Sequence, residues 1–386
     1  MSKSLVLSFR KLYPNSKSGA RIDAFFLLSV LLLCILGTVA VFSAGSAYAY
    51  ARYDDANYFI KKQIVWLLLG FAVMVTASSI KSEIYKKFSP HFYVITIVLL
   101  ILVLLIGFAG NGAQRWISIG PLTIQPSEIA KLSMVMMLAR YFSDHEEAAI
   151  CKGGKKSFLY GTMFPLLIMI APILLVMLQH HLSCIIILGT LGLLIIFIAG
   201  VNPKYISFFC IVGIIAVTFL ALFTDYTKDR ITVWQNPEAY KLTGGWQTLQ
   251  GLMAIGSGGV FGLGIGNSVL KHCYLSEPAN DMIFAIICEE TGLFGATVIL
   301  VLFALLIYRG VVIALKSENT YTRILVLGIC IKIAVQTLLN VAVVTNTIPN
   351  TGISLPFFSY GGSSLIMILF EMGIILSASR NAKIGK

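Results

Sequence analysis

The residues best suited to chemistry are four carboxylates in the segment 276–295, which reads SEPANDMIFAIICEETGLFG. Asp281 stands where a polar stretch gives way to an apolar run, with Glu277 before it and Glu289 and Glu290 inside the run. A carboxylate at the mouth of a membrane helix is costly to keep there, which makes it a functional candidate. The same aspartate could instead cap the helix that begins at this point. This segment alone leaves both interpretations open.

A second group of charged residues lies in the segment 110–131. Glu128 and Lys131 share one face of a helix because they are three residues apart, and Arg115 precedes them in a polar stretch. Lys131 lies in an otherwise apolar run, which favours a pocket or an ion pair over exposure to lipid. Two interpretations follow: a structural cluster of ion pairs, or a cationic patch that binds a phosphate at the outer membrane surface.

The elements that carry these residues are predicted from the composition of the chain. Hydrophobic residues make up 58% of the 386 residues, charged residues make up 12%, and the mean hydropathy is +0.87, all typical of an integral membrane protein. A span needs about 20 apolar residues. We therefore predict one all-α polytopic domain over residues 1–386, with about ten transmembrane helices near 24–43, 63–80, 91–109, 126–142, 158–178, 182–199, 206–223, 281–308, 322–344 and 361–379.

The distribution of lysine and arginine predicts the orientation of these helices. Basic residues are concentrated in the loops on the same side as the two termini, which places both termini in the cytoplasm. Residues 1–23 then form a cytoplasmic segment, and residues 224–280 form a long extracytoplasmic loop between the seventh and eighth helices. The first apolar run is longer than the ~7–15 residues of a signal-peptide core, so we expect it to be retained. The net charge of +12 follows from this bias and from anionic lipid, so no nucleic-acid partner is expected.

Two more segments on the predicted outer face are rich in residues that break helices. The glycine run 256–266 lacks the Lys-Ser/Thr pair of a nucleotide-binding P-loop, so close backbone packing in a sheltered segment is expected. The segment 349–364 contains two prolines and several small residues, among them Ser359 and Ser363. We expect it to form a buried turn that supports a cavity.

The ninth predicted helix carries three polar residues in an apolar context. Gln336 and Asn340 are four residues apart and can hydrogen-bond across a bundle, and Lys332 shares a face with Gln336. Lys332 either pairs with a carboxylate such as Glu289 or Glu290 or extends inward alone, and the sequence does not choose between these alternatives. The two His-containing pairs at 180–181 and 272–273 lie in different loops without ligand spacing, so a transition-metal site is not favoured.

Five motifs resemble, in order, those of the SEDS proteins (shape, elongation, division and sporulation): QPSEIAK at 125–131, AIGSGG at 254–259, DMIFA at 281–285, EETG at 289–292 and LPFFSYGGSS at 355–364. The resemblance covers nearly the whole chain. It implies a bacterial inner-membrane peptidoglycan glycosyltransferase that polymerises lipid II outside the cytoplasmic membrane, beside a class B penicillin-binding protein that crosslinks the product. Gln247 with Gln250, and the segment 268–275, look more like the division (FtsW-like) branch than the elongation (RodA-like) branch.

The resemblance also implies roles for individual residues. The family's essential loop aspartate falls on Asp281, which we expect to act as general base on the 4-hydroxyl of the acceptor sugar. Arg115 and Lys131 are expected to hold the pyrophosphate, and a divalent cation such as Mg²⁺ is a further expectation. The expected substrate-binding residues are Arg115, Glu128, Lys131, Glu277, Gln247, Ser359 and Ser363, and the expected structural or coupling residues are Glu289, Glu290, Lys332, Gln336 and Asn340.

Two positions depart from the family pattern. Gln179-His180-His181 stands where the family has Gln-Pro-Asp, and Ala279 stands where it has a histidine. The missing aspartate leaves Glu128 as the nearest acidic partner for Lys131. The reaction class expected from the resemblance is unchanged, but the fine architecture of the site is open.

Two other functions stay open. A lipid II transporter would also need a polar interior, although it would place its charges near the middle of the membrane. A non-catalytic recruiter would only position the crosslinking enzyme. Beyond lipid II and the penicillin-binding protein, the expected partners are other divisome proteins and membrane lipid, at the division site of the inner membrane.

Overall fold

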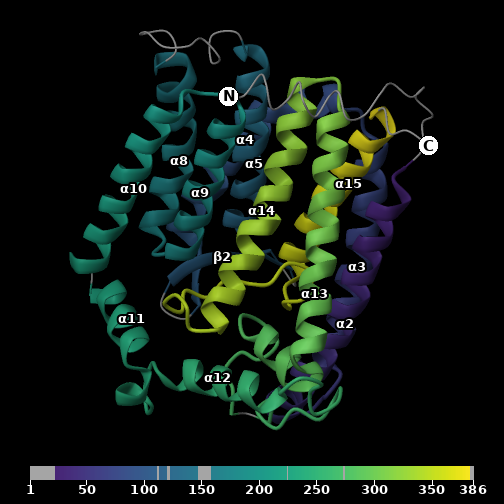
Figure 1. Cartoon of the computed structure of the whole chain (residues 1–386), viewed down its shortest axis with the longest axis vertical. Coiled ribbons are helices and arrows are strands. Elements are labelled where there is room, and N and C mark those ends of the chain that lie inside the picture. The colour runs from purple at the N-terminus through teal and green to yellow at the C-terminus, as the bar shows by residue number, and fades with distance from the viewer. Residues whose placement is uncertain are drawn as a thin grey trace.

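The computed structural model describes residues 22–110, 113–119, 122–146, 158–223, 225–272 and 274–382. Most of the predicted cytoplasmic segment 1–23, and Cys273 of the 272–273 pair, therefore lie outside the described residues. The rest of the chain forms a bundle of long helices that stand side by side, with shorter helices across one end (Figure 1).

Each of the ten predicted helices has a counterpart among the described residues. The ten are α2 Ala24–Tyr53, α3 Tyr58–Ser79, α4 Ser82–Ile106, α5 Pro126–Asp144, α8 Phe164–Leu178, α9 Leu182–Ile198, α10 Pro203–Phe223, α13 Ile283–Lys316, α14 Thr320–Val344 and α15 Gly362–Asn381. A π-helical turn, Leu159–Met163, leads into α8. Over the described residues, seven helices are long and apolar enough to cross a membrane, so a polytopic membrane fold is confirmed.

Helix α5 is the centre of the bundle. It packs against α4, α8, α9, α14 and α15, and 13 of its 19 residues are buried. It is not among the seven apolar helices, since its sequence carries Glu128, Lys131, Arg140 and Asp144. By contrast, α2, α3 and α4 expose large apolar side chains such as Phe25, which is 72% exposed and suits a surface that faces lipid. Glu128 and Lys131 of α5 are therefore buried within the protein, whereas Arg140 and Asp144 near its C-terminal end are partly exposed.

A small antiparallel sheet precedes α5 and was not predicted. Its strands are β1 Phe108–Gly110, β2 Ala113–Ile119 and β3 Leu122–Ile124, in the order β1-β2-β3. Ile117 pairs with Ile124 and its side chain is buried, whereas Ser118 is exposed. This alternation and the Asn111-Gly112 pair in the sequence are typical of a β-hairpin, although the sequence analysis did not predict one. The sheet fixes where β2 presents Arg115 and Trp116.

About half of the segment predicted as a long loop is helical. It contains α11 Asp225–Gln235, a 3₁₀ turn at Pro237–Tyr240 and α12 Trp246–Gly258, which lie across the lower end of the bundle in Figure 1. The first and last described residues meet at the opposite end: the Asp23 amide donates to Ser379 Oγ (3.2 Å), and Arg309 pairs with Asp23 (2.8 Å). Both described ends of the chain therefore lie on one side of the bundle and α12 on the other.

The glycine run packs its backbone directly against α13, as expected. Helix α13 is interrupted at Gly292, whose φ is 66°, and Gly262 faces it with a φ of 78°. A Cβ on Gly262 would lie 2.2 Å from the carbonyl oxygen of Glu290, and one on Gly292 would lie 2.4 Å from the amide nitrogen of Gly262. Backbone amides cross this contact in both directions, from Leu263 to Glu289 (3.0 Å) and from Leu293 to Gly259 (3.0 Å).

Candidate functional site

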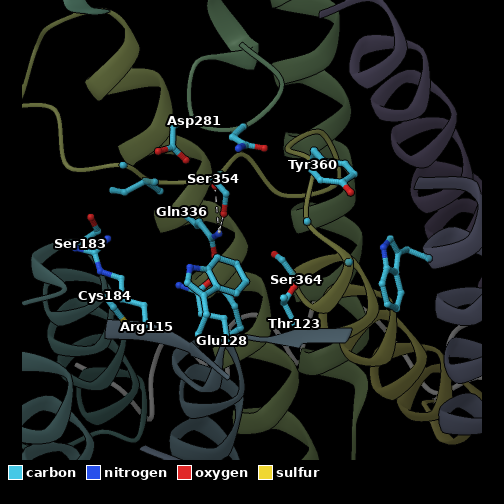
Figure 2. A pocket seen from close by; sticks show the side chains of 18 of the residues that line it. Arg115, Thr123, Glu128, Ser183, Cys184, Asp281, Gln336, Ser354, Tyr360 and Ser364 are labelled. Atoms are coloured by element: carbon cyan, nitrogen blue, oxygen red, sulfur yellow. Dashed lines mark hydrogen bonds between the residues drawn. The ribbon is translucent and has the colours of Figure 1, made fainter. Parts of the chain in front are cut away.

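A cavity of about 930 Å³ opens at the α12 side of the bundle, within the size range of ligand pockets (Figure 2). Its walls come from α3, the sheet, α5, α9, α14, the approach to α13 and the 349–364 segment. The predicted site residues that line it are Arg115, Glu128, Lys131, Glu277, Asp281 and Gln336. The fold thus brings together charged residues from three separate parts of the sequence.

The backbone around Asp281 is fixed by several hydrogen bonds. Asn340 Nδ2 donates to the Asp281 carbonyl oxygen (3.0 Å) and to that of Ile353 (2.6 Å). Ser359 Oγ donates to the carbonyl oxygen of Asn280 (2.8 Å). Asn340 and Ser359 therefore position the aspartate through its main chain.

The Asp281 carboxylate itself has no hydrogen-bond or ion-pair partner among the described residues. The residue at the N-cap of α13 is Met282, and no side chain caps this helix. The helix-capping interpretation of Asp281 is therefore wrong. In Figure 2 the carboxylate lies at one end of the drawn side chains, with Arg115 and Glu128 at the other.

The surroundings of Asp281 change its acidity. Burial is the largest cause and, with the nearby negative charge of Glu277, raises the pKa of Asp281 to about 6, against the opposing effect of Arg115 and Arg230. A carboxylate of this pKa is mostly ionised at neutral pH yet remains a stronger base than an ordinary aspartate. This pKa suits a general base.

Glu128 and Lys131 form the ion pair that their spacing predicts. Lys131 Nζ lies 2.7 Å from Glu128 Oε1 and also donates to Gln336 Oε1 (3.2 Å). Both charged side chains are almost completely buried, at 5% and 2% exposure for Glu128 and Lys131. The charge of Lys131 is thus balanced within the protein, which makes it a weaker phosphate ligand than the sequence suggested. Gln336, which donates to Ser354 (3.2 Å) across the bundle, also lines the cavity.

Arg115 extends from β2 into the same region. Its Nη2 donates to the carbonyl oxygen of His180 (2.8 Å), and its Nε has no partner. The adjacent His181 lines the cavity, where burial first and then Arg115 lower its pKa to about 3, so its ring is neutral. Sequence reasoning did not select His181 as a site residue, although its departure from the family pattern was a usable signal.

The opposite wall carries two lysines that the sequence analysis missed. Lys61 and Lys62 lie in the first turn of α3 and line the cavity. Lys61 pairs with Asp55 (2.8 Å), and Lys62 lies over the Tyr58 ring (4.2 Å from its centroid). Both lysines are exposed. Two consecutive lysines at the start of an apolar helix were the available signal.

Three predicted substrate-binding residues do not line the cavity. Gln247 accepts a hydrogen bond from Asn350 (3.0 Å) and donates to the carbonyl oxygen of Ser276 (3.3 Å), so it joins α12 to two loops. Ser359 supports the backbone before Asp281. The wall contains Ser364 and not its neighbour Ser363.

Of the two alternatives left open for Lys332, the structure has the pair with a carboxylate, but the partner is neither Glu289 nor Glu290. Lys332 Nζ lies 2.5 Å from Glu371 Oε1, and both side chains are fully buried between α14 and α15. Glu371 was missed, although an acid inside the apolar run LIMILFEMGIIL is a strong signal in a membrane helix. The pair joins two helices in the interior of the bundle.

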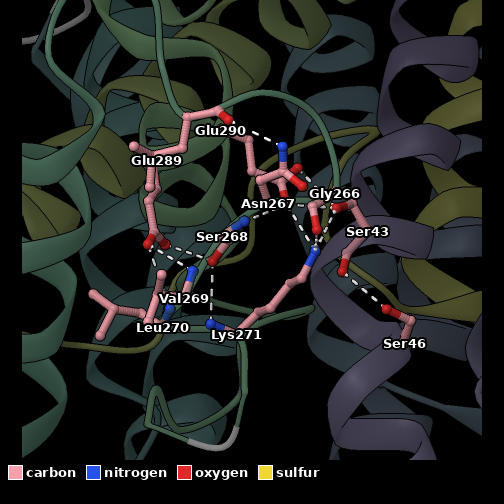
Figure 3. Close-up of polar contacts among 11 residues, drawn as sticks. Ser43, Ser46, Gly266, Asn267, Ser268, Val269, Leu270, Lys271, Glu289 and Glu290 are labelled. Carbon is pink, nitrogen blue, oxygen red and sulfur yellow. Dashed lines mark hydrogen bonds and ion pairs between the residues drawn. The ribbon is translucent and has the colours of Figure 1, made fainter.

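Glu289 and Glu290 belong to a separate buried cluster with Ser43, Ser268 and Lys271 (Figure 3). Glu290 accepts hydrogen bonds from Ser43 Oγ (2.6 and 2.7 Å) and pairs with Lys271 Nζ (3.0 Å). Glu289 accepts from Ser268 Oγ (2.5 Å) and from the amide of Val269 (2.9 Å). This cluster fastens the segment after the glycine run to α2 and α13, which agrees with the structural role predicted for the two glutamates.

The described residues contain no group of three or more His, Cys, Asp or Glu side chains that could hold a metal ion. Asp281 and Glu277 both line the cavity, and the charge of Glu277 acts on Asp281. Such a pair is compatible with Mg²⁺ only if a ligand supplies further oxygens, as substrate phosphates do at many magnesium sites.

The long apolar helices and the open cavity with charged residues in its wall define a polytopic membrane protein with a candidate binding site near one end of its helix bundle. The chain belongs to the FtsW/RodA/SpoVE family: the sequence model of that family, described as "Cell cycle protein", matches residues 23–384.

Individual relatives agree with this assignment. The chain is 37% identical to stage V sporulation protein E of Bacillus subtilis over 94% of this chain and 98% of the relative. It is 36% identical to the probable peptidoglycan glycosyltransferase FtsW of Geobacter sulfurreducens over 96% and 98% of the two chains.

Solved structures share the fold. The crystal structure of the rod shape determining protein RodA of Thermus thermophilus superposes with a TM-score of 0.69 at 25% identity, over 94% of this chain and 97% of that chain. A chain from a peptidoglycan synthase complex that coordinates polymerization and crosslinking superposes with a TM-score of 0.77 at 24% identity, over 93% and 98%.

Proposed function

We propose that the protein is a peptidoglycan glycosyltransferase that polymerises lipid II into glycan strands during cell division, with Asp281 as the general base. The observation that carries the role of Asp281 is its carboxylate, which has no partner among the described residues although it faces a cavity lined by cations. The relatives named as probable peptidoglycan glycosyltransferases support the reaction, and their FtsW names support the division role.

In the proposed reaction Asp281 accepts the proton of the acceptor sugar's 4-hydroxyl. That oxygen forms a bond to C1 of the donor sugar, and the bond between C1 and the pyrophosphate oxygen breaks. Negative charge develops on the leaving pyrophosphate, so cations near it lower the barrier. Arg115, Lys61 and Lys62 are the best placed for this role, because the charge of Lys131 is already balanced by Glu128.

A divalent cation is a further part of the proposal. Glu277 would hold it together with oxygens of the pyrophosphate, which leaves the Asp281 carboxylate for the proton, and the cation would supply additional positive charge to the leaving group. Removal of divalent cations with a chelator should then lower the polymerisation rate, and Mg²⁺ should restore it.

The proposed topology has ten spans, both termini in the cytoplasm and the 224–280 segment outside. Three observations support it: the ten helices, the Asp23–Ser379 contact that joins the two described ends of the chain, and the position of α12 at the opposite end (Figure 1). The proposed partner is a class B penicillin-binding protein. The chain that superposes from a complex combining polymerization with crosslinking supports this kind of partner.

The test is polymerisation of labelled lipid II by the purified protein, with and without the cognate penicillin-binding protein. We expect glycan chains with the wild-type protein and none with Asp281→Asn. A wild-type protein that moves lipid II across liposome membranes but makes no chains would support a transporter instead. Asp281→Asn cells that grow normally, with the complex intact, would support a recruiter.

A further inference from the structure

The cavity has two chemically different halves. Lys61 and Lys62 are exposed at one wall, where their contacts with Asp55 and Tyr58 lie at the surface and can be exchanged for a ligand. At the buried wall Glu128 and Lys131 cancel each other's charge at 2.7 Å, and Gln336 is neutral. An anionic group is therefore favoured at the exposed half, whereas the buried half suits an uncharged polar group.

Two atoms of the buried half have no partner among the described residues. They are Oε2 of Glu128 and Nδ1 of His181, and their side chains are only 5% and 7% exposed. Buried polar atoms in folded proteins nearly always have a hydrogen-bond partner, because an unmade hydrogen bond costs free energy. Both residues line the cavity, and their two unpartnered atoms are shielded from solvent, so the side chains must turn before a ligand in the cavity can provide the missing partners.

The polarity of these atoms restricts the ligand. The Glu128 carboxylate can only accept a hydrogen bond, and a neutral imidazole offers one donor and one acceptor. The low pKa of His181, about 3, follows from its burial and keeps the ring neutral. A phosphate offers only acceptors and would be repelled by Glu128. A secondary amide offers an N–H for the carboxylate and a carbonyl oxygen for the imidazole N–H.

We propose that Glu128 and His181 bind a secondary amide of the lipid-linked substrate, with the amide N–H donating to Glu128 Oε2 and the amide carbonyl accepting from His181. This inference rests on the proposed function, since it assigns part of the same substrate. His181 is then a specificity-determining residue: it selects an amide-bearing substrate without taking part in bond formation. Two groups of lipid II contain such an amide, the N-acetyl groups of its sugars and its peptide stem.

The test measures binding, so that it does not depend on turnover. The affinity of the detergent-purified full chain is measured for three ligands: lipid II, an analogue with hydroxyls in place of the N-acetylamino groups, and an analogue without the peptide stem. The same ligands are tested on His181→Phe, which keeps a planar ring but offers no hydrogen bond, and on His181→Asn, which keeps a donor and an acceptor. His180→Asn is the matched control, because His180 is exposed and does not line the cavity.

We expect His181→Phe to bind lipid II about 10-fold more weakly, the size of one lost hydrogen bond, and His181→Asn to bind within about 3-fold of the wild type. The analogue that lacks the recognised amide should bind the wild type and His181→Phe equally, which identifies the source of the amide. Unchanged binding by His181→Phe, or an equal loss for all three ligands, would overturn the proposal.

If His181→Phe does not fold, the proposal can still be tested on the wild-type protein alone. The wild type alone should then prefer lipid II over one of the two analogues by about 10-fold, and equal affinities would overturn the proposal. Polymerisation by the wild type is measured in parallel. Its absence would contradict the proposed function, whereas the binding ratios would still decide the role of His181.

Discussion

Two groups of carboxylates, Glu289 with Glu290 and Asp281 with Glu128, differ in how their oxygens are used. In the cluster of Glu289 and Glu290 all four carboxylate oxygens accept hydrogen bonds from protein groups (Figure 3). At Asp281 neither oxygen does, and Glu128 has one oxygen without a partner. A carboxylate whose oxygens all accept hydrogen bonds from the protein fixes the backbone around it. A carboxylate with an oxygen that has no partner is available to a ligand. Burial alone therefore does not distinguish structural from functional carboxylates in this bundle, but the number of hydrogen bonds that their oxygens accept does.

The largest expected effect is on the polymerisation rate, and it comes from Asp281, whose carboxylate has no hydrogen-bond partner among the described residues. Asp281→Asn should lower the polymerisation rate about 10²–10⁴-fold, because an amide cannot accept the proton of the acceptor hydroxyl. The thermal stability of the variant should not fall, since the carboxylate makes no hydrogen bond that the substitution could break. Chain length and rate on labelled lipid II are measured together with thermal unfolding. A rate within a few-fold of the wild type would remove Asp281 as the base.

Substitutions in the Glu289 and Glu290 cluster should instead lower stability and leave substrate binding unchanged. Glu290→Ala leaves Lys271 buried without its partner, and loss of one member of a buried pair costs about 3–5 kcal/mol. Its unfolding temperature should drop sharply, while the protein that remains folded keeps the wild-type KM. The matched control is the double variant Lys271→Met/Glu290→Leu, which should recover much of the stability because neither charge is left unpaired. A double variant as unstable as the single one would contradict this account.

The raised pKa of Asp281 should make both the polymerisation rate and the stability of the fold depend on pH. Because the base must be ionised and the pKa of Asp281 is about 6, the polymerisation rate should rise about tenfold per pH unit below 6 and level off above it. The stability of the fold should change in the other direction. The folded protein holds this proton more tightly than the unfolded chain, so the stabilising effect of Asp281 is complete below its ordinary pKa and is lost as the pH rises through 6.

The measurement for this pH prediction is the unfolding temperature across the same pH range. Asp281→Asn should lack the decline between about pH 4 and 6. A wild-type rate that is flat from pH 5 to 8 would contradict the raised pKa.

The smallest expected effect concerns a residue that supports the site from outside the cavity. Ser359→Ala removes a hydroxyl that accepts from the Leu355 amide (2.7 Å) and donates to the Asn280 carbonyl (2.8 Å). We expect a loss of about 1–2 kcal/mol in stability and a modest fall in the rate with KM unchanged. Ser363→Ala, which makes no hydrogen bond among the described residues, should stay within about 0.5 kcal/mol of the wild type. Equal effects of the two substitutions would contradict the supporting role of Ser359.

Local patterns predicted the parts of the molecule that depend on neighbours in the sequence. The ten apolar runs predicted the helices, since a span in lipid must satisfy its own backbone. The spacing of Glu128 and Lys131 predicted their ion pair, because one helix turn brings them together. Asp281 was predicted by its place at the start of an apolar run and by the family resemblance.

Contacts between distant residues were not predictable in the same way. The sequence offered Glu289 or Glu290 as partners of Lys332 without choosing between them, and only the packing of α15 against α14 selects Glu371. In the sequence, Lys61 and Lys62 look like ordinary residues of the membrane interface. Only the position of α3 in the fold brings them into the cavity wall. The sheet itself has strands of only three and seven residues, too short for a pattern in composition to stand out.

The contact between Gly262 and Gly292 has a consequence for the genetics of this protein. A Cβ on Gly262 would meet the backbone of Glu290 and Thr291, one on Gly292 would meet the backbone of Val260 and Gly262, and both glycines have positive φ angles. A defect caused by Gly262→Ala therefore cannot be suppressed by shortening a side chain on α13, because the new methyl group would meet only backbone atoms there. Suppressors of such a defect must instead lengthen or loosen the surrounding backbone. Selection for revertants should return mostly the original codon.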